Sequence, residues 1–141
     1  MEMSLTRTEL RDKAVQVLYQ MYIYDKANIT YDIKDLIKEQ IGFENEYVYE
    51  LVSGVQKNQK DISALADKYL IDWELDRLSK VDKAIVSVAI YELMYTDTPS
   101  IVCINEAIEL SKKYSDDSVV KMINACLDKI YHEEELDKDG E

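Results

Sequence analysis

Residues 81–95 read VDKAIVSVAIYELMY, and this stretch decides the fold class. Its apolar residues cover almost the whole circumference of the helix that it predicts. A helix of this kind lies at the centre of its domain. The segment TDTP at 96–99 ends it, because Pro99 cannot continue a helix. We therefore expect residues 81–95 to form a central helix.

Amphipathic stretches with helical spacing lie on both sides of this centre. The chain has only three glycines and one proline, and it contains no Asn-Gly or Asp-Gly hairpin signal. Few breakers and abundant helix formers predict an all-α fold. The expected helices, besides the central one, cover residues 6–25, 33–41, 43–59, 61–70, 100–114 and 116–131, with a short helical turn at 73–78.

Two local signals refine this pattern. Thr6 and Glu9 have the Thr-x-x-Glu spacing of a capping box, which predicts that the first helix begins there. Gly54 lies inside an expected helix, where it costs about 1 kcal/mol relative to Ala. We interpret Gly54 as a position where another helix approaches closely, and we expect Gly54→Leu to destabilise the fold.

Length and composition favour one compact domain over residues 1–131. With 141 residues, of which 47% are hydrophobic and 33% charged, the chain can bury a sizeable core. The formal net charge is −12, and residues 132–141 form an acidic tail that we expect to be disordered. This charge argues against simple RNA binding, which gains affinity from cations that neutralise phosphates; solubility alone also explains it.

The constellations of enzymes are absent from the sequence. It has one histidine, His132, and no glycine-rich phosphate loop. Glu106 and Glu109 lie one turn apart, but the Glu-x-x-His pairs of carboxylate metal sites are missing. Cys103 and Cys126 are interpreted as core residues of a reducing compartment. We expect no enzymatic activity, no cofactor and no metal.

No apolar run approaches the roughly 18–20 residues that span a membrane, and the N-terminus lacks the apolar core of a signal peptide. These patterns predict a cytoplasmic protein with no membrane association. What remains is binding: Arg7, Arg11 and Lys13 place three cations within two turns of the first helix. They suit contact with an RNA backbone, and a mixed surface helix explains them equally well.

A set of motifs runs along nearly the whole chain, and the most specific of them is INEAIELSK at 104–112. The others are AVQVLYQ at 14–20, LVSGV at 51–55, VDKAIV at 81–86, AIYEL at 89–93, DS at 117–118, KMIN at 121–124 and LDKI at 127–130. In this order and spacing, the motifs resemble the bacterial NusB family of transcription antitermination factors.

The resemblance implies about seven helices in two packed three-helix subdomains. It also implies binding partners: boxA-like RNA of ribosomal RNA transcripts, a small-subunit ribosomal protein that acts as an antitermination factor, and the RNA polymerase antitermination complex. Family members help the polymerase to pass terminators, without catalysis. Some are monomers and some are dimers, so a homodimer stays open.

Residue by residue, the resemblance implies two sets of contacts. RNA-binding positions are Arg7, Arg11, Lys121 and Met122, and Lys13 joins them because of its spacing on the first helix. Partner-binding positions are Tyr69, Asp82 and Asp117. On these grounds Arg11→Glu is expected to weaken RNA binding without loss of helicity. Tyr69 and Met122 are also compatible with core packing, and Asp117 with a helix cap.

The chain departs from the family pattern on the expected RNA face. Thr8 and Glu9 stand where the family is often basic, Ser87 replaces an arginine, and Met122 replaces an aromatic residue that can stack on a base. These changes motivate an alternative function. The chain is then a protein-interaction module of the same fold, self-associating or not, with weak or lost RNA binding.

Overall fold

The computed structural model describes residues 4–134, which form six α-helices and one three-residue 3₁₀ helix, with no strand among them. The predicted all-α class is confirmed. The elements are α1 (Arg7–Lys26), α2 (Ile33–Ile41), α3 (Glu46–Tyr69), η1 (Leu75–Arg77), α4 (Lys80–Tyr95), α5 (Ser100–Tyr114) and α6 (Asp117–Glu133).

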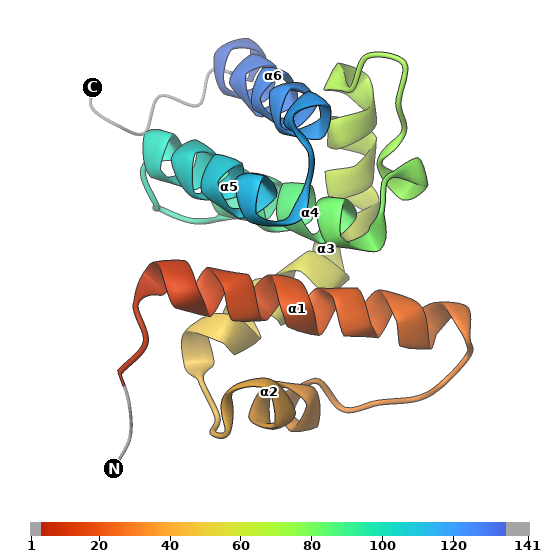
Figure 1. Ribbon diagram of the computed structural model, residues 1–141, viewed down its shortest axis with the longest axis vertical. Coiled ribbons are helices and arrows are strands. Elements are labelled where there is room, and N and C mark those ends of the chain that lie inside the picture. The colour runs from red at the N-terminus through yellow and green to blue at the C-terminus, as the bar shows by residue number, and fades with distance from the viewer. Residues whose placement is uncertain (1–3, 135–141) are drawn as a thin grey trace.

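Helix α4 is the centre of the molecule, as its sequence predicts. It contacts α1, α3, α5 and α6, and its buried residues run from Ala84 to Leu93 without a break. Figure 1 shows α1 lying across the molecule, α2 on one side of it, and α4, α5 and α6 on the other. The long helix α3 runs between the two sides and packs against α1, α2, α4 and α6.

Side-chain caps explain where the helices begin. The predicted capping box is present, because the Thr6 hydroxyl accepts from the Glu9 amide at 3.1 Å and the Glu9 carboxylate accepts from the Thr6 amide at 2.9 Å. At α6 the cap is Asp116, whose carboxylate accepts from the Val119 amide at 3.1 Å. Asp117 is therefore the first helical residue and not the cap.

The prediction of two helices over 43–59 and 61–70 is wrong, since Glu46–Tyr69 is the single helix α3. Lys60 lies between the two stretches and continues the helix, because residues 55–69 contain no glycine or proline to break it. The expected number of seven helices is likewise wrong within residues 4–134, where there are six. Helices α1–α3 contact one another, as do α4–α6, and α4 contacts both groups; the division into two subdomains stays a prediction.

Helix α6 extends past residue 131, where we expect it to end. Helix α6 continues to Glu133 and Glu134 caps it, so residues 132–134 belong to the helix and its end. Residues 135–141 of the predicted tail lie outside the described residues.

The interpretation of Gly54 is confirmed by its contact with α4. A Cβ atom added at Gly54 would lie 2.3 Å from Cζ of Tyr91. The absence of a side chain is therefore what lets the Tyr91 ring pack across α3. No helix in the described part of the chain is long and apolar enough to cross a membrane.

Candidate nucleic-acid interface

Arg11, one of the predicted RNA contacts, is buried in an ion pair. Its side chain is 7% exposed, and its Nε and Nη2 donate to the two carboxylate oxygens of Glu92 at 2.8 and 3.1 Å. Its Nη1 also donates to Glu106 at 3.3 Å. This two-point geometry is the strongest arrangement available to an arginine and a carboxylate.

Glu92 lies at the centre of a polar cluster in the most apolar helix. Besides Arg11, it accepts from the hydroxyls of Tyr47 at 3.0 Å and Thr98 at 3.4 Å. Burial alone would lower the pKa of Arg11, but the hydrogen bonds and charge of Glu92 raise it above its usual value. The cluster thereby joins α1, α3, α4 and the α4–α5 turn.

The buried pair changes the role expected of Arg11. Its guanidinium is directed into the protein and is already held by two carboxylates. A substitution such as Arg11→Glu would place a second carboxylate beside Glu92, so the expectation that it leaves the fold intact is physically untenable. We assign Arg11 a structural role.

Arg7, one turn earlier, is exposed. Its guanidinium carbon lies 3.8 Å from the centroid of the Tyr47 ring. An arginine stacked in this way keeps its N–H edge available to bind a phosphate. Because the Tyr47 hydroxyl is fixed by Glu92, the buried cluster also positions the surface on which Arg7 rests.

Lys13 and Lys121 present further positive charge. Lys13 is half-buried on α1 and Lys121 is exposed on α6. Within residues 4–134, Arg7, Lys13 and Lys121 form no ion pair. In contrast, Lys113 pairs with Asp12 on the neighbouring part of α1.

The remaining predicted residues have mixed environments. Met122 and Tyr69 are half-buried against the hydrophobic core, and the Tyr69 hydroxyl donates to Glu134 at 2.6 Å. Asp82 is buried and accepts a hydrogen bond from the Ser115 hydroxyl, which fixes the turn before α6. Asp117, two residues after Ser115, is exposed.

Sequence reasoning missed the roles of Glu92 and Tyr47. Glu92 had a usable signal, because a carboxylate in the middle of the most apolar helix requires a buried partner. The partner itself, 81 residues away in the sequence, had no local signal.

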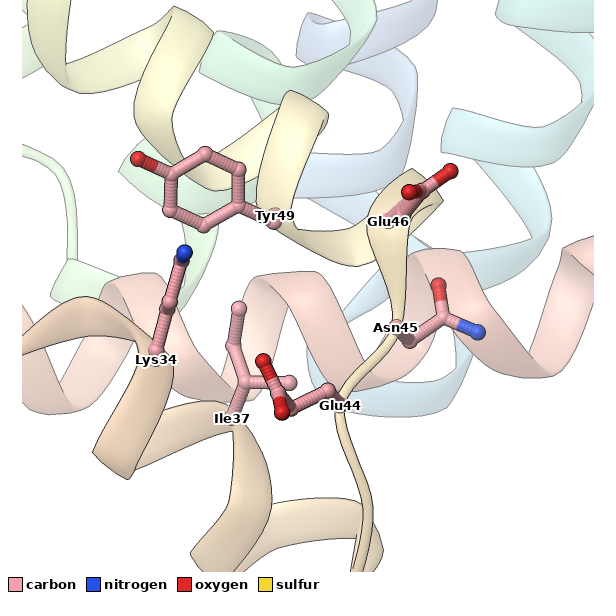
Figure 2. Close-up of a pocket in the computed structure, with 6 residues that line it drawn as sticks. All are labelled: Lys34, Ile37, Glu44, Asn45, Glu46 and Tyr49. Atoms are coloured by element: carbon pink, nitrogen blue, oxygen red, sulfur yellow. The ribbon is translucent and has the colours of Figure 1, made fainter.

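Two surface cavities adjoin the start of α3. One, of about 600 Å³, is lined in part by Arg7, Arg11, Tyr47 and Thr98. The other, of about 580 Å³, lies between α2 and the start of α3, and Figure 2 shows Lys34 directed toward the Tyr49 ring there. None of the predicted site residues lines this second cavity. Within residues 4–134, no group of three His, Cys, Asp or Glu could hold a metal ion.

Comparison with known proteins places the chain in a family. The model of the NusB family matches residues 8–132. The chain belongs to the NusB family. Its curated relatives include the transcription antitermination protein NusB of Listeria monocytogenes serotype 4a, which is 36% identical over 92% of this chain and 99% of its own length. The protein of the same name from Clostridium perfringens strain SM101 is 35% identical over 90% and 97%.

Solved NusB structures share the fold. T. maritima NusB aligns with a TM-score of 0.80 at 30% identity, covering 93% of this chain and 94% of that one. A chain from a crystal structure of the antitermination factors NusB and NusE in complex with dsRNA aligns with a TM-score of 0.74 at 25% identity, covering 90% and 96%. The NusB fold thus accounts for nearly all of the described helices.

Proposed function

We propose that this NusB-family chain is a transcription antitermination factor. It binds boxA-like RNA of ribosomal RNA transcripts together with a small-subunit ribosomal protein and helps RNA polymerase to read through terminators. Relatives named transcription antitermination protein NusB match the chain over almost their whole length, and this match supports the proposal. So does the complex in which a structural neighbour, NusB, is bound with NusE and dsRNA.

The RNA contacts that we propose are Arg7, Lys13 and Lys121. The observation that carries this choice is that, of the four cations predicted as RNA contacts, these three form no ion pair in the part of the chain that the structure describes, whereas Arg11 is paired with Glu92 and Glu106. Arg11 supports Arg7 from inside, through Glu92 and Tyr47. Met122 contributes apolar contact at most, since it packs partly on the core and offers no ring for base stacking.

We place the partner contacts near the start of α6. Asp117 is exposed there, and Asp82 holds Ser115 two residues before it. Asp82 then acts by fixing the turn that presents Asp117. We also infer that α1–α3 and α4–α6 are the two three-helix subdomains, because each group is mutually packed.

RNA binding measured at two salt concentrations, with and without the ribosomal protein, tests the proposal. Three phosphate contacts to a single strand predict that log K falls with log salt with a slope of about −2. Raising salt from 50 to 200 mM should therefore weaken binding by about 20-fold. Salt-independent binding, or none in the presence of the partner, would contradict the proposed RNA role.

A second candidate is a protein-interaction module of the same fold with weak or lost RNA binding. Two observations favour it: the net charge of −12, and four exposed apolar residues flanking the α4–α5 turn. These residues are Met94, Tyr95, Ile101 and Val102. A chain that binds the ribosomal protein or itself, but not RNA, would support this candidate. Sedimentation over a range of concentrations measures self-association.

A further inference from the structure

The end of α3 and the end of α6 meet in a small polar cluster. Tyr69 is the last residue of α3, and its hydroxyl donates to Oε2 of Glu134, the residue that caps α6, at 2.6 Å. Nζ of Lys68 lies 3.4 Å from the same oxygen. One carboxylate oxygen thus receives a hydroxyl and an ammonium together.

This arrangement has the chemistry of an anion-binding site. An ammonium and a hydroxyl that converge on one oxygen bind a phosphate oxygen as readily as a carboxylate oxygen. The Tyr69 hydrogen bond lowers the pKa of Glu134, because it stabilises the charged carboxylate. Lys68 itself is 63% exposed, so the site opens to solvent on its charged side.

Two carboxylates lie at this end of α6, because exposed Glu133 precedes Glu134. The same end of the helix therefore supplies both the carboxylate that occupies the site and a second negative charge that repels nucleic acid.

We infer that Lys68 and Tyr69 form a phosphate-binding site for RNA, and that Glu134 occupies this site in the free protein. RNA must then displace the chain's own carboxylate. The inference rests on the proposed RNA-binding function. It assigns Tyr69, which the family resemblance implies as a partner contact, to RNA, and it adds Lys68 as a contact and Glu134 as an intramolecular competitor.

Glu134 binds Lys68 and Tyr69 weakly enough for an RNA phosphate to displace it. An ion pair this exposed contributes little free energy, equivalent to at most about five-fold in an equilibrium constant. Glu134 therefore tunes RNA affinity and does not block it. A neutral residue at position 134 should strengthen RNA binding by about two- to five-fold.

Paired substitutions in the full chain test this inference. Glu134→Gln keeps the shape of the side chain and removes its charge. Glu133→Gln is the matched control, because Glu133 is the exposed neighbour of Glu134 and its substitution removes the same single charge. Affinity for a boxA-like RNA, in the presence of the ribosomal protein and at 0.15 M salt, should rise about two- to five-fold with Glu134→Gln and clearly less with Glu133→Gln.

A second background identifies the site. In Lys68→Ala/Tyr69→Phe, the advantage of Glu134→Gln over Glu133→Gln should disappear, and RNA binding should be weaker than in Glu134→Gln alone. Equal effects of the two glutamine variants, with the wild type binding RNA, would overturn the inference and leave the proposed function standing. If neither the wild type nor any variant binds RNA, the proposed function and this inference both fail.

Discussion

Replacing Arg11 by Ala should destabilise the fold by about 3 kcal/mol. Removing one partner of a buried ion pair costs about 3–5 kcal/mol, because the other charge stays desolvated. Side chains of Arg11 and Glu92 are 7% and 2% exposed, so the pair meets this condition. The loss should lie at the lower end, since Tyr47 and Thr98 still donate to Glu92.

Urea unfolding followed by far-UV circular dichroism measures this loss directly. Lys13→Ala is the matched control, because it removes one cation from the same helix without breaking an ion pair within residues 4–134. We expect the control to change the free energy of unfolding by about 0.5 kcal/mol or less. A loss below about 1 kcal/mol for Arg11→Ala, or one equal to the control's, would refute the structural role of Arg11.

The double variant Arg11→Met/Glu92→Leu separates charge from packing. Replacing both members of a buried pair by apolar residues of similar size is often neutral or stabilising. We therefore expect it to be more stable than Arg11→Ala. If the double variant were the less stable of the two, packing of the Arg11 side chain rather than desolvation of Glu92 would be the cause.

Further predictions concern Gly54, Arg7 and Cys126. Gly54→Ala should lower the free energy of unfolding, because its Cβ would lie 2.3 Å from Tyr91, although Ala normally stabilises a helix by about 1 kcal/mol relative to Gly. Gly54→Leu should cost about 1–3 kcal/mol, and a melting curve that shows a more stable variant would contradict the contact. Arg7→Ala should reduce the salt slope of RNA binding by about 0.7 and should cost at most about 1 kcal/mol of stability, because it removes the stacking on Tyr47. Lys38→Ala, which removes the same charge from α2, should leave the slope unchanged. Burial raises the pKa of Cys126 to about 12, so its thiol should resist alkylation at pH 8 until the protein unfolds, and rapid labelling of the native state would contradict this. Because the pKa of Cys126 is raised in the folded state, the buried neutral thiol contributes its full stability below the unfolded pKa of about 8.5. This stability is lost as pH rises toward 12, because the unfolded state loses the thiol proton first. Urea unfolding at pH 8 and 10.5 should show the decline.

The sequence predicts most of the fold because its signals are local. Pro99 and the apolar periodicity of residues 100–114 predict a helix over that stretch, and α5 has these bounds. The Thr6–Glu9 capping box spans only four residues, so the sequence alone reveals it, and it is present in the structure. The error at α3 came from a weakly apolar stretch around Lys60, where periodicity fades although nothing breaks the helix.

The candidate site is less predictable because its contacts are distant in sequence. Arg7 and Arg11 look equivalent on a helix, one turn apart, yet one is exposed and the other buried. What distinguishes them is Glu92, which reaches Arg11 only after α4 packs against α1. A pattern of basic residues therefore identifies the helix, but tertiary packing decides which cation can contact RNA.

The same reasoning explains how a chain with a net charge of −12 can bind RNA. Within residues 4–134, seven lysines and arginines form ion pairs, and Arg7, Lys13 and Lys121 are not among them. At physiological salt, charges farther than about 8 Å are largely screened, so binding depends on the charges at the contact surface more than on the total. The excess negative charge acts mainly on the encounter, which it slows at low salt. A cationic ribosomal protein bound beside this surface would remove that repulsion, and the RNA association rate should rise most at low salt when this partner is present.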